Sequence, residues 1–414
     1  MDMDNTGRWL RRIYISEIVS NIGSRMTSVA LVYLLYRQTG KGSNLGFYFM
    51  LITLPGILFA NPFGCLADRF DRKSLLVYAD STRAGILAFM AFFIPPERTT
   101  LLLAFAFLSQ IFRTLYDTSI TPLASDLTRD EGRLVKATAN LKIIFHTSYI
   151  FGLGVGGFAA AYFRPQYIFM MDAGTFVFSA CLINSIPIEK KAPSGYRLLA
   201  AEMVTPKYYL RWFHLVRDGF KMVWRHEYCK TIILLELTRD FAYGLFNPLQ
   251  SLWPQALFGS IKNSLGISLG MIGVGCVVGG IFANRTLSKT LSNKSVFFRL
   301  CVVLSLGELF AAVGAYSSNS FYFYSIGLFV SAAFMNVFEV GTFVKYISVA
   351  RDDEKGAMTG FFQFIMRAAV FAGGGLYVLV ADNVAVRLLP LIPLVLLAAA
   401  GVLMLFKKSS FQDI

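Results

Sequence analysis

The stretch Gly64-Cys65-Leu66-Ala67-Asp68-Arg69-Phe70-Asp71-Arg72-Lys73 decides the fold. It places five charges within six residues, from Asp68 to Lys73. One long apolar run, residues 45–67, ends beside these charges, and another, residues 74–94, begins directly after them. A helix needs about 20 mostly apolar residues to cross a bilayer, and both runs are long enough. We therefore expect a helical hairpin whose charged loop lies at one membrane face.

The composition extends this reading to the whole chain. Apolar residues make up 55% of the 414 residues and charged residues 15%, with a mean hydropathy of +0.56. These values differ from those of soluble globular proteins and favour an all-α membrane protein. We predict twelve transmembrane helices, at residues 13–36, 45–67, 74–94, 100–124, 137–163, 166–187, 229–258, 264–284, 296–316, 320–344, 357–381 and 386–406.

The net charge of +14 raises the question of nucleic-acid binding, but the positions of the basic residues argue against it. With the N-terminus in the cytoplasm, the cytoplasmic segments contain most of the basic residues, including nine Lys and Arg between Lys190 and Lys230. The opposite face has only Arg37, Lys41, Arg98, Arg164, Lys262 and Arg387. This asymmetry follows the positive-inside rule. It predicts that both termini are cytoplasmic and that no nucleic acid is a partner.

Three matches at nearly one spacing indicate an internal duplication. Gly280-Ile281-Phe282-Ala283-Asn284-Arg285 is a weaker copy of the charged loop, 216 residues later. Residues 15–21 and 234–240 match at an offset of 219, and residues 137–140 and 357–360 match at 220. We therefore predict two parallel six-helix halves, residues 1–188 and 229–414. The linker between them, residues 189–228, contains an amphipathic helix at 208–224 that lies on the cytoplasmic membrane surface.

The charged loop resembles the signature loop G-x-L-A-D-R-x-x-R-K of the major facilitator superfamily. Asp172-Ala173-Gly174-Thr175-Phe176 and Arg217-Asp218-Gly219-Phe220 are similar to motifs of its bacterial exporter branch, which includes the enterobactin exporter and macrolide-efflux permeases. The resemblance covers nearly the whole chain. It implies a secondary transporter whose substrate is held between the two halves near the membrane midplane.

The resemblance also implies a gating latch at the charged loop. In the family these residues pair with neighbouring helix ends in the outward-facing state. Carried over to this chain, the latch consists of Gly64, Asp68, Arg69, Arg72, Lys73 and Asp126. Asp71 replaces a small residue of the family pattern, so the charge partners can differ here. The alternative is that the basic residues serve only to orient the protein in the membrane.

Charged residues inside membrane segments are the candidates for binding and coupling, because each costs at least about 2.5–3.5 kcal/mol to insert. Glu17, Asn21 and Arg25 recur every four residues and therefore share one helix face. We expect them to line a central cavity together with a second set: Arg113, Asp117, Glu236, Asp240 and Arg367. Glu17 is the preferred proton carrier. The alternative is a fixed ion pair that only orders the helices.

A glycine-rich stretch lies in the fifth apolar segment. Gly152, Gly156 and Gly157 belong to a pattern that resembles the antiporter motif G-P-x-x-G-G, with Leu153 in place of proline. Glycines allow two helices to approach closely, so we predict a helix-packing role. Gly373-Gly374-Gly375 is the counterpart in the second half.

These observations predict a monomeric transporter in a bacterial inner membrane that exports a small organic molecule, siderophore-like or drug-like, by alternating access coupled to protons. The five cysteines have no metal-ligand spacing, and no phosphate-binding P-loop is present, so we expect no metal, no cofactor and no enzymatic activity. The alternatives are an importer or flippase of an amphiphile such as a lysolipid, and a membrane sensor without transport. A membrane enzyme with Asp117 and His146 as an acid–base pair lacks a supporting motif.

Overall fold

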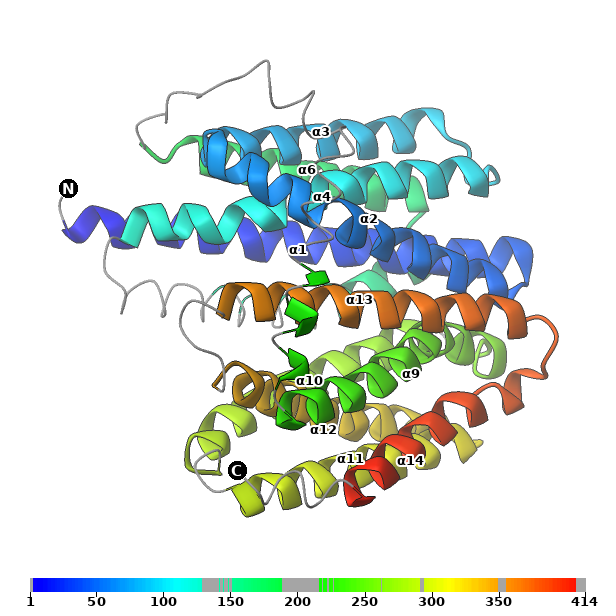
Figure 1. Cartoon of the computed structure of the whole chain (residues 1–414). Coiled ribbons are helices and arrows are strands. Elements are labelled where there is room, and N and C mark those ends of the chain that lie inside the picture. The colour runs from blue at the N-terminus through cyan, green and yellow to red at the C-terminus, as the bar shows by residue number, and fades with distance from the viewer. Residues whose placement is uncertain are drawn as a thin grey trace. The chain divides into compact units, whose positions relative to one another are not determined.

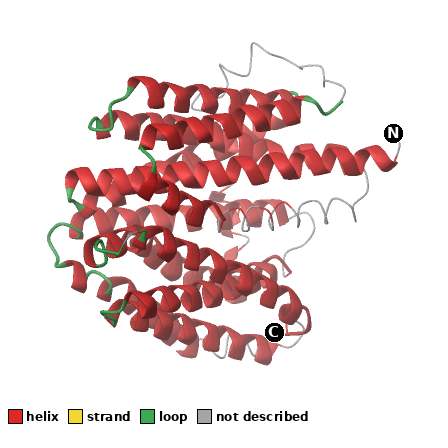
Figure 2. Ribbon diagram, turned by 180° about the vertical axis from the view of Figure 1, so that it is seen from behind, coloured by secondary structure: helices red, strands yellow, loops and turns green. Residues whose placement is uncertain are grey.

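The computed structural model describes most of the chain as helices joined by short loops (Figure 2). The described residues are 3–128, 141, 144, 148, 151–187, 216–217, 219–221, 223–225, 227–261, 263–290, 294–348 and 355–406. Within them no strand occurs. The predicted amphipathic helix at 208–224 is therefore described only from residue 216 onward.

Each of the twelve predicted segments contains helix, which confirms the all-α, twelve-helix fold. Eleven carry long labelled helices: α1 (Met3–Thr39), α2 (Gly42–Arg69), α3 (Arg72–Phe93), α4 (Thr99–Thr128), α6 (Pro165–Asn184), α9 (Glu227–Leu257), α10 (Ser264–Thr290), α11 (Lys294–Ser317), α12 (Phe321–Ser348), α13 (Lys355–Val380) and α14 (Leu391–Phe406). The fifth predicted segment, 137–163, is described as helix over residues 151–162.

Eight described helices are long and apolar enough to span a membrane by length and composition, and three further apolar helical stretches are shorter. Helix α9 is absent from both groups. The first half of its 31 residues carries five charges (Glu227, Lys230, Glu236, Arg239 and Asp240), and the second half contains Asn247, Gln250 and Gln255, which also lower its hydropathy. The helix that is hardest to recognise by hydropathy is thus the one richest in candidate site residues.

The last predicted segment begins differently from its prediction. A short 3₁₀ turn, η1 (Val386–Leu388), precedes α14, which starts at Leu391 rather than at residue 386. Pro390 lies between them and has no backbone N–H to donate to an earlier carbonyl. An α-helix that began at 386 would therefore be interrupted there.

The chain forms two compact units. Unit 1 comprises residues 1–40 and 51–205, and unit 2 comprises residues 41–50 and 206–414. In unit 2, the first residues of α2 pack against α13, where a Cβ on Gly46 would lie 2.7 Å from the Tyr377 ring. Helix α2 therefore contributes to both units.

In unit 1, α1 packs against α6 and α4, and α3 packs between α4 and α6 (Figure 1). In unit 2, α9 packs against α13 and α14, α10 against α12, and α11 against α12 and α14. Each unit has a buried apolar cluster, around Ile13, Leu76 and Leu123 in unit 1 and around Ile232, Phe338 and Phe362 in unit 2. Val223 joins the second cluster, while Phe220 and Trp224 of the same stretch are exposed and stack on one another at 4.3 Å.

Candidate transport sites in the two units

The first polar cluster of unit 1 is built by α1 and α4. Glu17 and Asn21 stand one turn apart on α1, are both buried, and are joined by a 2.8 Å hydrogen bond from Asn21 Nδ2 to Glu17 Oε2. On α4, Arg113 Nε lies 2.8 Å from Asp117 Oδ1. The charges of Arg113 and Asp117 both act on the Glu17 carboxylate. The structure thus brings four of the five candidates of the first half together.

Arg25, the fifth candidate, lies two turns further along α1. It is half-buried, and its stem faces the helix at 151–162, where a Cβ on Gly152 would lie only 2.6 Å from Arg25 Cβ. A Cβ on Gly156 would lie 2.8 Å from the Met26 Cα. The two glycines therefore let this helix approach α1 closely. Gly157 is buried in the same helix.

A second polar cluster in unit 1 was missed by sequence reasoning. Asp80 and Arg83, one turn apart on α3, are buried with Nη1 and Oδ1 3.6 Å apart. Ser179 of α6 donates to Asp80 at 2.5 Å, and Arg83 donates to Ser24 of α1 at 3.1 Å. The available signal was two charges in the apolar run 74–94 at a spacing that places them on one helix face.

Asp172 of α6 completes this cluster. It is buried and accepts hydrogen bonds from Thr27 of α1, at 2.6 Å, and from Thr175, at 3.1 Å. Gly23 of α1 lies against the same two α6 side chains. Polar contacts from α3 and α6 thus hold the middle of α1.

Unit 2 has a buried ion-pair network centred on Arg239 of α9. Its Nη2 lies 2.7 Å from Glu308 Oε2 of α11, and its Nη1 lies 3.5 Å from Glu236 Oε2. Thr342 of α12 donates to the other oxygen of Glu236. The guanidinium also covers the Phe338 ring at 3.9 Å. Arg239 and Glu308 were not among the chosen candidates, although both are buried, as is Glu236.

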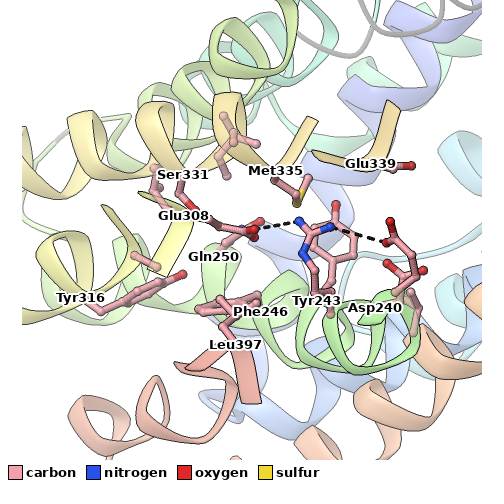
Figure 3. A pocket seen from close by; sticks show the side chains of 17 residues that line it. Asp240, Tyr243, Phe246, Gln250, Glu308, Tyr316, Ser331, Met335, Glu339 and Leu397 are labelled. Atoms are coloured by element: carbon pink, nitrogen blue, oxygen red, sulfur yellow. Dashed lines mark hydrogen bonds and ion pairs between the residues drawn. The ribbon is translucent and has the colours of Figure 1, made fainter. Parts of the chain in front are cut away.

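A cavity of about 260 Å³ lies beside this network, enclosed by side chains of α9 to α14 (Figure 3). Glu236 and Asp240, both predicted, line it, as do Glu308 and Glu339. Aromatic walls come from Tyr243, Phe246 and Tyr316. Arg367 of α13 is exposed and is not among the residues that line this cavity. Among the described residues, no group of three or more His, Cys, Asp or Glu is arranged to hold a metal ion.

The predicted latch residues lie at the end of unit 1 where α2 meets α3. Arg72 donates to Asp126 of α4 at 2.6 Å and to the backbone oxygens of Ala67 and Pro122 at 3.0 Å. Lys73 donates to the Ile186 carbonyl at 2.8 Å.

The remaining residues of the charged loop have other positions. Asp71 caps the N-terminus of α3 by accepting from the Ser74 backbone N–H at 2.9 Å, which explains why the loop tolerates a charge there. Gly64 has open space around it. Asp68 and Arg69 end α2, and their side chains lie outside the described residues, as does His146.

Long apolar helices, several of which carry paired charges in their interiors, are typical of a secondary transporter. The chain belongs to the Major Facilitator Superfamily, whose family description matches residues 13–373. It is a multi-pass membrane protein of that transporter family.

Relatives of this chain agree with this assignment. Macrolide efflux protein A of Streptococcus pyogenes is 22% identical over 307 residues, which cover 71% of this chain and 72% of that protein. The uncharacterized MFS-type transporter YkuC of Bacillus subtilis is 25% identical over 187 residues. That match covers 44% of this chain and 43% of YkuC, so it spans less than half the length of that relative.

Solved structures show the same fold. The nucleoside transporter NupG superposes with a TM-score of 0.72 at 12% identity, covering 98% of this chain and 100% of NupG. A bacterial homologue of the human lysosomal transporter Spinster, in an inward-facing and unoccupied conformation, superposes with a TM-score of 0.73 at 12% identity. The superposition covers 100% of this chain and 99% of the Spinster homologue.

Proposed function

We propose that this protein exports a small, drug-like organic molecule from the bacterial cytoplasm by alternating access. The observation that carries the proposal is the set of buried charges at the centres of membrane helices, gathered in unit 2 around a cavity. Charges at such positions are costly unless they are paired or used. The similarity to a macrolide efflux protein supports the direction and the class of cargo.

The energy source in this proposal is the proton gradient, with Glu17 as the proton carrier. Glu17 is 5% exposed, and only one of its carboxylate oxygens, Oε2, accepts the hydrogen bond from Asn21. The other oxygen, Oε1, is buried and has no hydrogen-bond partner within the described residues. A proton on that oxygen would change the balance with Arg113, whose charge already acts on Glu17. The rival for this cluster is a fixed ion pair that only orders α1 and α4.

The latch in this proposal is the Arg72–Asp126 pair with its neighbours Gly64, Asp68, Arg69 and Lys73. The pair joins the start of α3 to the end of α4. The protein is placed in the inner membrane with both termini in the cytoplasm, because the basic residues concentrate in the loops assigned to that side.

The test uses inside-out vesicles from bacteria that express the protein, with a panel of labelled drugs that begins with a macrolide. We expect accumulation inside the vesicles when they are energised, and loss of accumulation when a protonophore collapses the gradient. Glu17→Gln should abolish gradient-driven accumulation, and Glu97→Gln, a change in the exposed turn between α3 and α4, should not.

Other outcomes point to the rival functions. Accumulation only in right-side-out vesicles would identify an importer. Movement of a labelled lysolipid between leaflets, without drug accumulation, would identify a flippase. Ligand binding without any flux would identify a sensor. Each of these results contradicts drug export.

A further inference from the structure

The ionisable residues around the unit 2 cavity are mostly acidic. Of the described residues that line it, four are acidic and one is basic: Glu236, Asp240, Glu308, Glu339 and Arg239. Arg239 is committed to Glu308 and Glu236 through its two ion pairs. The remaining carboxylates, Asp240 and Glu339, have no hydrogen bond or ion pair within the described part of the chain.

These two spare carboxylates lie at one end of the cavity. Figure 3 shows Asp240 of α9 and Glu339 of α12 at the same end, beyond the network that occupies Arg239. Their charges act on one another as well as on Glu236. Carboxylate charges held close together in a protein repel one another. A bound cation would relieve that repulsion.

The other end of the cavity is aromatic. Phe246 and Tyr316 stack at 5.6 Å, and Tyr316 meets Trp253 edge-on at 5.0 Å. Tyr316 is 7% exposed and lines the cavity, and its hydroxyl makes no hydrogen bond of normal geometry with a described residue. A buried hydroxyl without a partner is unfavourable. The Tyr324 hydroxyl is its polar neighbour, and a polar ligand atom in the cavity would give it a hydrogen bond of better geometry.

We propose that this cavity binds the ammonium group of an amphiphilic organic amine, with Asp240 and Glu339 as its counter-ions and Tyr243, Phe246 and Tyr316 around its apolar part. Aromatic faces and carboxylates both attract an organic cation. A volume of about 260 Å³ is below the range of about 300–1,000 Å³ typical of ligand sites, so it holds the amine-bearing part of a larger substrate. The inference rests on the proposed export function and narrows its cargo from drug-like or siderophore-like molecules to amines.

The test is calorimetric titration of the purified full-length protein in lipid nanodiscs. The probes are benzyltrimethylammonium and phenylmethanesulfonate, which share a benzyl group and carry opposite charges, and protein-free nanodiscs give the background. We expect saturable binding of the cation and none of the anion. Asp240→Asn and Glu339→Gln should each weaken cation binding roughly tenfold, a change equivalent to about 1.4 kcal/mol.

Two controls separate charge from folding. Glu339→Asp keeps the charge and should retain most of the affinity. Glu97→Gln removes an exposed carboxylate outside the cavity and should leave the affinity unchanged. The variants are compared only where they remain monodisperse with the same thermal unfolding profile. If both charge-neutral variants misfold, Phe246→Ala is used instead. The Phe246 side chain lines the aromatic end of the cavity, so this change should abolish cation binding if the cation binds there, and unchanged binding would place the cation elsewhere.

Three results would overturn the inference. Equal binding of the two probes would show that charge does not select the ligand. Cation binding that survives in the Asp240→Asn, Glu339→Gln double variant would place the cation elsewhere. Carboxylate-dependent binding of Mn²⁺ without amine binding would make the cavity a metal site. Because the assay involves no flux, amine binding without transport contradicts only the export proposal, and export of uncharged drugs without amine binding contradicts only this inference.

Discussion

The two units bury their charges in different ways. In unit 1 the buried charges bridge neighbouring helices: Arg83 reaches Ser24, Asp80 accepts from Ser179, and Asp172 accepts from Thr27. In unit 2 one arginine, Arg239, serves two carboxylates, and two further carboxylates at the cavity have no partner among the described residues.

The difference teaches that buried charge in one fold can serve either packing or binding. A polar contact between helices stabilises the arrangement in which its two groups meet. In unit 1 the contacts to Ser179, Ser24 and Thr27 do this, while Asp80 Oδ1 and Arg83 Nε make no hydrogen bond within the described residues. Carboxylates that face a cavity without a partner stabilise nothing by themselves, and natural proteins retain such groups mainly at functional sites. We therefore assign helix docking to the Asp80–Arg83–Asp172 cluster and ligand contact to Asp240 and Glu339.

The largest expected effect on stability concerns the buried Arg239 network of unit 2. Arg239→Gln leaves Glu236 and Glu308, whose side chains are 2% and 8% exposed, without their cation. Breaking a buried ion pair costs about 3–5 kcal/mol. We expect a loss of that size in the free energy of unfolding, measured by titration with SDS in mixed micelles.

The matched change in unit 1 is Arg113→Gln. Its partner Asp117 has a side chain that is 45% exposed and can be solvated when the arginine is removed. We expect a smaller loss, about 1–3 kcal/mol. Equal losses of stability for the two variants would contradict the distinction between the buried Arg239 network of unit 2 and the partly exposed Arg113–Asp117 pair of unit 1.

Sequence alone predicted the helices well and the site in part. The apolar runs predicted all twelve helical segments because the bilayer requires long apolar stretches that no loop imitates. The repeat offset directed attention to α9, where Glu236 and Asp240 both line the cavity, and their role in transport stays a prediction. Hydropathy by itself passes over α9, because its charges lower the average that identifies the other helices.

The missed residues share a physical reason. Glu308, Arg83 and Asp80 become site residues only because a second helix brings a partner within reach. One helix face can be read from spacing in the sequence, but the face of another helix that meets it cannot. Arg239 was passed over although it stands next to Asp240, since nothing in its spacing distinguishes an arginine that pairs from one that faces a ligand.

The second expected effect concerns a helix crossing that both units share. In unit 1, Gly152 of the helix at 151–162 meets α1 at Ile22 and Arg25. In unit 2, Gly373 of α13 meets α9 at Phe241 and Gly244. These α9 positions follow the α1 positions by 219 residues, the offset that relates Glu17 to Glu236. The two units thus show a similar crossing, made by different residues at the same spacing.

Gly373→Ala should cost more than Gly152→Ala. A Cβ on Gly373 would press on the Phe241 carbonyl and lie 3.2 Å from Gly244 Cα, both of which are backbone. A Cβ on Gly152 meets Arg25 Cβ at 2.6 Å and the Ile22 carbonyl at 3.1 Å, so part of the obstruction is a side chain. We expect losses of about 1–3 kcal/mol for overpacking, with Gly373→Ala at the upper end, measured by the same SDS titration.

Gly314→Ala and Gly154→Ala are the controls in the two units, because a Cβ at either position meets nothing within 4 Å. Alanine favours helix over glycine by up to about 1 kcal/mol, so these changes should be neutral or stabilising. A Gly373→Ala variant as stable as Gly314→Ala would show that the α9–α13 crossing is looser than the structure indicates.

The smallest expected effect on stability concerns the charged loop of unit 1. Asp126→Asn removes the charge that faces Arg72, but the Asp126 side chain is 46% exposed, and pairs of this kind contribute at most about 1 kcal/mol. Arg72 keeps its two backbone contacts. Insertion and unfolding should therefore be nearly unchanged, while drug accumulation in energised inside-out vesicles should fall severalfold if the pair is a latch.

Glu97→Gln again provides an exposed carboxylate change outside the loop. Full accumulation in the Asp126→Asn variant would contradict the latch. The basic residues of the charged loop would then serve only to orient the protein in the membrane.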